Sequence, residues 1–196
     1  MDIALQTQRL VLRRFTEADT EALAALYGDP AVMRFITGAP QSAAEVASEI
    51  LPGILCRYAG SDGLGCLAAV DRLTGRFAGQ FSLEPANSFG LTAGDGLELG
   101  YRLAPAFWGR GLATEGARAL IDAAFGAQLA DHVVATTMAV NTGSWRVLEK
   151  CGLRRVRTFW YEGPDLMPGA EQGDYVYELT RADWELQAGA SGPVRS

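Results

Sequence analysis

The stretch at residues 97–125, LELGYRLAPAFWGRGLATEGARALIDAAF, decides the fold of this chain. Its first seven residues alternate in character and predict a strand over residues 97–103, with Gly100 marking a bulge or a close approach of another backbone. A turn with two glycines, Trp108-Gly109-Arg110-Gly111, follows. A helix is predicted from this turn to residue 125, because small or apolar residues recur there at every fourth position. They are Leu112, Gly116, Leu120 and Ala124.

The rest of the chain predicts further strands separated by helices. Alternating β-formers bounded by turn residues predict strands over residues 9–15, 66–70, 76–83, 132–140, 153–161 and 174–180. Capping residues and glycine stops predict helices over residues 17–27, 31–36, 43–58, 141–151 and 181–187. No repeat or low-complexity linker divides this order. The pattern therefore predicts one α+β domain with a mixed sheet over residues 1–187, followed by a flexible tail over residues 188–196.

Composition excludes several classes of protein. Of 196 residues, 48% are hydrophobic and 20% charged, which is typical of a soluble globular domain rather than a collagen, a coiled coil or a disordered chain. The net charge of -6 argues against a nucleic-acid partner and suits a cationic one. No apolar run reaches the length of a membrane span, and the amino terminus has no secretory pattern. Cys56, Cys66 and Cys151 form no CxxC pair, so we expect a reduced, cytoplasmic protein.

The glycine turn has the properties of an anion site. Gly111 has no Cβ, so an anionic group can approach its backbone, and the N–H groups from Arg110 to Thr114 open the helix without intrahelical acceptors. A tight turn that only permits helix packing has the same sequence. A P-loop is excluded because no Gly-Lys-Ser/Thr follows, and a dinucleotide fingerprint is disfavoured because Thr114 stands where its third glycine belongs.

Three segments in order resemble the GNAT superfamily of N-acetyltransferases: ELGYRLAPAFWGRGLATEGARALI (98–121), NTGSWRVLEKCGL (141–153) and YVYELTRADW (175–184). Together with the opening TQRLVLRRFTEADTEALAALYGDPAVMRF (7–35), they are most similar to the Rim-type branch, the ribosomal-protein N-terminal acetyltransferases. One position departs from the superfamily pattern: Trp108 stands where Gln or Arg is usual, which puts a side-chain contact to the ligand there in doubt.

The resemblance implies a central, twisted, mixed sheet of six to seven strands flanked by helices, with two strands splayed at a slot for acetyl-coenzyme A. It places the pyrophosphate on the turn, the pantetheine arm along the end of the preceding strand, and the thioester near Asn141 and Ser144. It implies no metal. The implied binding residues are Tyr101, Arg102, Leu103, Trp108, Gly109, Arg110, Gly111, Leu112, Ala113, Thr114, Asn141 and Ser144.

The implied reaction is direct transfer of acetyl to a primary amine. Glu98 is the first candidate for the base and Glu84 the second, whereas Ser144 would protonate the leaving thiolate, with Tyr161 or Tyr175 as substitutes. The main-chain N–H of Leu99 or Gly100 would face the thioester oxygen. Simpler roles compete: Glu98 fits an exposed strand position, and Asn141 and Ser144 fit helix caps. His132 fits a structural role, and Cys151 lacks a histidine to activate it.

The acceptor is left open by the residues, and the resemblance favours a protein or peptide N-terminus. A small cationic amine such as a polyamine, an amino sugar or an antibiotic is the alternative. A non-catalytic acyl-CoA-binding module and a nucleotide-phosphate binder are rivals from other classes. No surface pattern decides for or against a homodimer. We expect loops at residues 84–96 and 162–173 to border the acceptor, and their carboxylates to attract a cation. These are Asp95, Glu162, Asp165 and Glu171.

Overall fold

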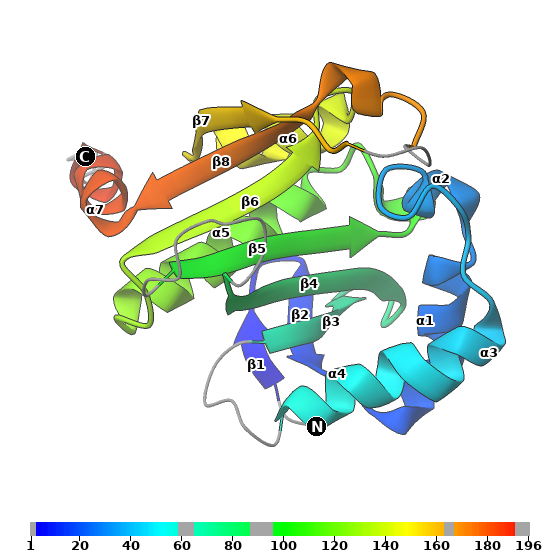
Figure 1. Cartoon of the computed structure of the whole chain (residues 1–196). Helices are drawn as coiled ribbons and strands as arrows, with labels where there is room; N and C mark the ends of the chain where they lie inside the picture. Colours follow the sequence, from blue (N-terminus) through cyan, green and yellow to red (C-terminus); the bar gives the residue numbers. More distant parts are fainter. Residues whose placement is uncertain (1–2, 59–64, 87–95, 163–166, 191–196) are drawn as a thin grey trace.

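A computed structural model describes residues 3–58, 65–86, 96–162 and 167–190 of the chain (Figure 1). Its centre is one twisted sheet in the order β1-β2-β3-β4-β5-β6-β8-β7. Neighbouring strands are antiparallel except for β5 and β6, which are parallel. The strands are β1 (Ile3–Gln6), β2 (Leu10–Arg14), β3 (Gly65–Asp71), β4 (Phe77–Pro85), β5 (Gly96–Leu103), β6 (His132–Met138), β7 (Arg154–Phe159) and β8 (Asp174–Thr180).

The predicted α+β class with a mixed sheet is confirmed, but the strand number is corrected. Among the described residues the sheet has eight strands rather than six or seven, because residues 3–6 form the additional edge strand β1. This strand pairs only with β2, across a turn in which the Thr7 N–H donates to the Leu10 carbonyl at 2.9 Å. Four residues at a sheet edge carry too short an alternation to be separated from a loop.

Helices cover both faces of the sheet. On one face lie α5 (Leu112–Gly126) and α6 (Thr142–Lys150); on the other lie α1 (Thr20–Tyr27) and α4 (Leu51–Arg57) (Figure 1). Successive residues of β3 point to opposite faces of the sheet. Leu67 packs in the hydrophobic core between the sheet and α5, and Ala68 packs in the core between the sheet and α1. The remaining helical segments are η1 (Glu17–Asp19), α2 (Pro30–Met33), α3 (Ala43–Glu45), η2 (Val46–Ile50), η4 (Pro105–Phe107), η5 (Ala170–Gln172) and α7 (Arg181–Ala190).

The predicted helix after the glycine turn is α5, and its small residues let it lie close to the sheet. A Cβ on Gly116 would stand 2.3 Å from Cζ of Phe81 on β4, so only glycine permits this approach. Ala117 and Leu120 are fully buried beside it. Close packing of α5 fixes the position of its amino-terminal turn relative to β4 and β5.

Two helix predictions differ from the structure in detail. The helix expected over residues 43–58 consists of α3, η2 and α4, with the predicted capping box between Ser42 and Glu45 in place. The middle segment, η2, is a π-turn that ends two residues before Pro52, whose nitrogen cannot donate a helical hydrogen bond. The last helix, α7, reaches Ala190, so residues 188–190 are helical rather than part of the expected tail.

Candidate active site

The two parallel strands separate after a short contact. β5 and β6 pair only at Gly96 with His132, Leu97 with Val133 and Glu98 with Val134. Beyond Glu98, β5 continues along β4 and β6 continues along β8. The splay that the resemblance implied is therefore present (Figure 1), and Glu98 is the last residue of β5 that pairs with β6.

The separation leaves an opening between β5 and β6. Main-chain N–H and carbonyl groups of β5 point into this opening at every second residue. The carbonyl of Gly96 accepts from Ala86, and the N–H of Ala104 donates to Ala78, so the even-numbered residues of this strand bond towards β4. The odd-numbered residues Leu99 and Tyr101 then face the opening. Of the two candidate donors to the thioester oxygen, Leu99 faces the opening, whereas Gly100 faces β4 and lies against Ser82.

The turn before α5 presents a run of unpaired donors. Gly109 and Gly111 adopt left-handed φ values of 70° and 77°, which side chains rarely tolerate. The first helical hydrogen bond runs from the Glu115 N–H to the Gly111 carbonyl, at 3.0 Å. Among the described residues, no acceptor is recorded for the six consecutive N–H groups from Gly109 to Thr114. The turn therefore fits a diphosphate, which accepts several such bonds at the positive end of a helix.

Trp108 explains how the turn does without Gln or Arg at its first position. Its indole N–H donates to the Leu103 carbonyl at 2.6 Å and so ties the turn to the end of β5. The side chain is 48% exposed. Trp108 thus supports the turn, and the Leu103 carbonyl already has a donor.

The side chains of two other predicted binding residues are engaged elsewhere. The guanidinium of Arg110 lies 3.7 Å from the carboxylate of Asp71 and over the ring of Phe107. The guanidinium of Arg102 lies 4.7 Å from the centre of the Tyr27 ring, on the α1 face of the sheet. Both side chains thus have partners within the protein.

Two predicted residues meet across the opening. The hydroxyl of Tyr101 on β5 donates to the Ser144 carbonyl on α6 at 2.9 Å and lies 3.1 Å from Ser144 Oγ. Burial raises the pKa of Tyr101, so its hydroxyl stays protonated. Asn141 caps α6, because its Oδ1 accepts from the Ser144 N–H at 3.2 Å. The capping role considered for Asn141 is therefore real, whereas Ser144 presents its hydroxyl to Tyr101.

The two candidate bases have different surroundings. Glu84 lies opposite Glu98 on β4 and forms an ion pair with Arg57 at 2.9 Å. Glu98 is half-buried and has no cationic partner among the residues that the structure describes. Its nearest recorded donor is the hydroxyl of Thr136 on β6, at 3.4 Å. Of the two candidate bases, Glu98 is thus the one without an ion pair among the described residues.

Tyr161 and Tyr175, the two possible substitutes for Ser144 as the acid, lie in different surroundings. Burial raises the pKa of Tyr161, and the neighbouring charges of Asp174 and Glu98 raise it further, which puts this ring on the Glu98 side. Tyr175 has the guanidinium of Arg155 stacked 4.4 Å from its centre. The Ser144 hydroxyl itself lies against that of Tyr101, 3.1 Å away.

The remaining predictions on reactive side chains have mixed outcomes. Cys151 is buried, and burial raises the pKa of its thiol to about 11, which disfavours a thiolate nucleophile. Glu171 accepts from the Gly169 N–H at 2.9 Å within its own loop. Asp95 and Asp165, expected to border the acceptor, lie outside the described residues. No group of metal-ligating side chains occurs within the described ranges, and none of the helices there is long and apolar enough to cross a bilayer.

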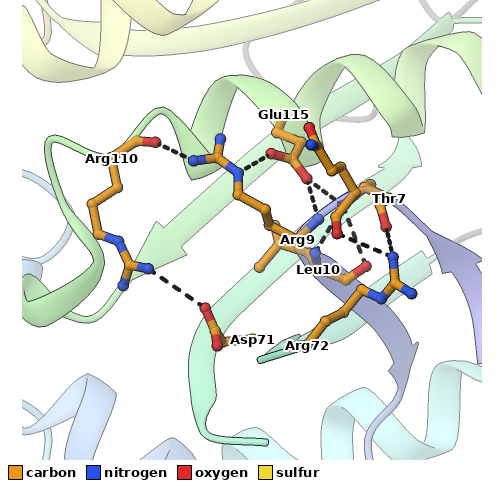
Figure 2. Close-up of polar contacts among 8 residues, drawn as sticks. Thr7, Arg9, Leu10, Asp71, Arg72, Arg110 and Glu115 are labelled. Atoms are coloured by element: carbon orange, nitrogen blue, oxygen red, sulfur yellow. Dashed lines mark hydrogen bonds and ion pairs between the residues drawn. The ribbon is translucent and has the colours of Figure 1, made fainter. Parts of the chain in front are cut away.

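Sequence reasoning missed the contacts that support the turn from outside. Arg9, just before β2, reaches Glu115 on α5 and the Arg110 carbonyl in the turn (Figure 2). An open pocket of about 430 Å³ adjoins them, lined by Thr7, Arg9, Gly111, Thr114, Glu115 and Arg118, among others. The partly buried hydrogen bond from the Tyr101 hydroxyl to the Ser144 carbonyl was also missed. No local signal could reveal these pairs, since their members are far apart in the chain.

Comparison with known proteins agrees with this geometry. Residues 9–154 match the family model described as the acetyltransferase (GNAT) domain. The FsC-acetyl coenzyme A-N(2)-transacetylase of Aspergillus fumigatus is 31% identical over 186 residues, covering 92% of this chain and 77% of that protein.

Two solved structures share the fold. An acetyltransferase of the GNAT family from Bacillus anthracis superposes with a TM-score of 0.72 at 22% identity, covering 91% of this chain and 98% of that one. The aminoglycoside acetyltransferase AAC(6')-Ib, solved in complex with coenzyme A, superposes with a TM-score of 0.70 at 21% identity, covering 91% and 99%. With the family match over residues 9–154, the splayed strands and the open turn identify this chain as a member of the GNAT family of acetyl-CoA-dependent acetyltransferases.

Proposed function

We propose that this enzyme transfers acetyl from acetyl-CoA directly to a primary amine, with the diphosphate held by the turn from Gly109 to Thr114. The observation that carries this proposal is the run of six N–H groups at the start of α5 that have no acceptor within the described part of the chain. It lies at the end of the connection from β5, the strand that borders the opening. A bound thioester would then extend from the turn towards Glu98 and Ser144.

The residues at the opening support a proton path on each side. Glu98 would accept the proton of the attacking amine as the new C–N bond forms. Ser144 Oγ would donate a proton to the departing sulfur as the C–S bond breaks, and the Tyr101 hydroxyl 3.1 Å away would hold Ser144 in position. The Leu99 N–H faces the opening, where it could donate to the thioester oxygen as negative charge develops.

For the acceptor, we propose a protein or peptide N-terminus, as the resemblance to the Rim-type branch implies. Deprotonating an α-amine with a pKa of about 8 at pH 7 costs about 1.4 kcal/mol, against about 4.6 kcal/mol for a lysine amine, so a single carboxylate suffices. A small amine is the second candidate. The relative named as an N(2)-transacetylase and the aminoglycoside acetyltransferase favour it.

The test is thiol release from acetyl-CoA with a matched panel of acceptors. It would contain peptides with free and blocked N-termini, a polyamine, a lysine side-chain analogue and an aminoglycoside. Turnover with free but not blocked peptides is the expected result. Turnover confined to a small amine would replace the acceptor, whereas coenzyme A binding without turnover would indicate a non-catalytic module. Tighter binding of ATP than of coenzyme A would contradict the assignment of the turn.

We also propose a reducing compartment for the protein. Cys56, Cys66 and Cys151 are all free thiols in the structure. Cys66 on β3 and Cys151, directly after α6, are both buried, which keeps these two thiols from the surface.

A further inference from the structure

A carboxylate stands where the proposed diphosphate site needs positive charge. Glu115 lies in the first turn of α5, directly after the six unpaired N–H groups. An acidic side chain there interacts favourably with the positive end of the helix, but it also repels an anion bound to the same end. A diphosphate site with Glu115 nearby therefore requires that this carboxylate be neutralised.

Residues of the turn between β1 and β2 bond to the Glu115 carboxylate and balance its negative charge. Its Oε1 accepts from the Thr7 hydroxyl at 2.6 Å and from the Arg9 main-chain N–H at 2.7 Å, and its Oε2 accepts from Arg9 Nε at 2.6 Å (Figure 2). The Glu115 side chain is only 17% exposed. Burial acts to raise the pKa of Glu115, but the bonds from Thr7 and Arg9 outweigh it and lower that pKa. Glu115 is thus an ionised, fully bonded partner of Arg9.

The same guanidinium also holds the turn. Arg9 Nη1 donates to the Arg110 carbonyl at 2.8 Å, between the helix and the loop (Figure 2). Arg9 Nη2 lies 3.6 Å from the position that a Cβ on Gly111 would occupy. One side chain from the amino-terminal hairpin therefore contacts both the first turn of α5 and the peptide that precedes Gly111.

Peptide geometry links this contact to the anion site. The carbonyl of Arg110 and the N–H of Gly111 belong to one planar trans peptide and point in opposite directions. Because Arg9 draws the carbonyl towards itself, the Gly111 N–H points away from Arg9 and cannot turn to face it. Arg9 thereby orients a central donor of the turn without lying on the donor's side.

We propose that Arg9 is a positioning residue for acetyl-CoA: it fixes the Arg110–Gly111 peptide and cancels the charge of Glu115. This inference rests on the proposed function, which places the diphosphate on this turn. It implies that the amino-terminal hairpin, 106 positions from Glu115 in the chain, controls affinity for the cosubstrate.

The experiment measures coenzyme A dissociation constants by calorimetry, together with kcat and KM for acetyl-CoA. R9Q should raise the Kd at least tenfold and leave kcat within about twofold, because no reacting atom is touched. R9K keeps the charge but cannot reach both partners in a fork, so its Kd should fall between those of wild type and R9Q. Added salt should reduce the ratio of the R9Q Kd to the wild-type Kd, because it screens the charge of Glu115.

The double variant R9Q/E115Q separates charge from structure. Removing the carboxylate that R9Q leaves unpaired should recover several-fold of the lost affinity, whereas a role in folding alone predicts no recovery. R72Q is the matched control, since Arg72 donates to the carbonyls of Thr7 and Gln8 and contacts neither the turn nor Glu115 (Figure 2). It removes the same charge from the same region and should keep the wild-type Kd within twofold.

Three outcomes would overturn the inference. They are an unchanged Kd in folded R9Q, an equal loss in R72Q, and no recovery in R9Q/E115Q. If R9Q does not fold, R9K still decides, because it must weaken binding if the contacts of Arg9 to both Glu115 and the Arg110 carbonyl matter. The inference alone fails when wild type binds coenzyme A, Gly111→Val does not, and R9Q equals wild type. The assignment of the turn fails when Gly111→Val binds as wild type does.

Discussion

The hydroxyl of Tyr101 donates to the main-chain carbonyl of Ser144 at 2.9 Å and lies 3.1 Å from the Ser144 hydroxyl, so β5 and α6 are joined across the opening between the splayed strands. This pair gives the proposed acid a fixed position. The resemblance implied that the pantetheine arm pairs along this end of β5, through the main chain of Tyr101. The structure adds a contact made by the Tyr101 side chain.

Removing the Ser144 hydroxyl should therefore slow transfer more than it weakens binding. Ser144→Ala is expected to lower kcat about 100-fold, the scale of a lost general acid, and to leave KM for acetyl-CoA within about threefold. Tyr101→Phe should lower kcat by a smaller factor, about tenfold, because Ser144 remains but is no longer held. Tyr175→Phe is the control and should behave as wild type. Equal losses in Tyr101→Phe and Tyr175→Phe would refute the assignment, and so would an unchanged kcat in Ser144→Ala.

Gly111 should be required for cosubstrate binding beyond its effect on stability. A valine there must adopt a φ of 77° and would place its branches towards Arg9. We expect Gly111→Val to raise the Kd for coenzyme A about 30-fold, as for the loss of one or two hydrogen bonds to a charged group.

Gly75 provides the matched control for this substitution. It has a φ of 68° with open space around it, so Gly75→Val imposes similar backbone strain, about 1–3 kcal/mol, far from the turn. Thermal unfolding should report comparable destabilisation in both variants. Weakened coenzyme A binding in Gly75→Val as well would mean that strain, rather than the anion site, explains the effect.

Glu98 should matter most where the amine is still protonated. Glu98→Gln is expected to lower kcat about 100-fold at pH 7, and the loss should shrink by pH 9, where an α-amine with a pKa of about 8 is mostly neutral. Glu84→Gln, which removes the partner of Arg57, should change kcat by less than threefold. A pH-independent loss in Glu98→Gln would argue for a structural role of this carboxylate.

The ion pair of Arg13 with Asp19 should make stability depend on pH. Burial acts to raise the pKa of Asp19, but hydrogen bonds from Arg13 at 2.6 and 2.7 Å and from Thr16 at 2.8 Å outweigh it and lower that pKa. Its stabilisation is therefore complete above the unfolded pKa of about 3.9 and is lost as the pH falls through the lower, folded value.

Asp19→Asn tests this pair by urea unfolding at pH 7 and pH 3. Removing one partner of a buried pair should cost about 3 kcal/mol at pH 7, and the difference from wild type should narrow at pH 3. Glu84→Gln breaks an exposed pair and should cost less than about 1 kcal/mol. A difference that stays constant over this pH range would show that the charge of Asp19 does not stabilise the fold.

The elements that were predictable are those whose pattern is local. The alternation in residues 97–103 and the four-residue spacing from Leu112 to Ala124 predict β5 and α5, and the Ser42 and Glu45 pair predicts the start of α3. Gly100 was expected to mark a bulge or a close approach of another backbone. Its pairing with β4 has no register shift, and the atom that its Cβ would meet, at 2.5 Å, is the side-chain Oγ of Ser82.

The features that were not predictable depend on contacts between distant residues. Tyr101 and Ser144 are 43 positions apart, and Arg9 and Glu115 are 106 apart, so no spacing in the sequence relates them. The π-turn at η2 is a local feature that we attribute to Pro52. Because proline is also common in the first turn of an ordinary helix, Pro52 does not predict a π-turn. The partners of the Trp108 and Arg110 side chains, the Leu103 carbonyl and the Asp71 carboxylate, were not predictable either.

The most direct measurement is a crystal structure of the protein with coenzyme A. We expect phosphate oxygens within hydrogen-bonding distance of main-chain N–H groups between Gly109 and Thr114, and the sulfur in the opening between β5 and β6, near Ser144. A diphosphate bound at another surface, or a turn whose N–H groups remain free of ligand while coenzyme A is bound, would contradict this expectation.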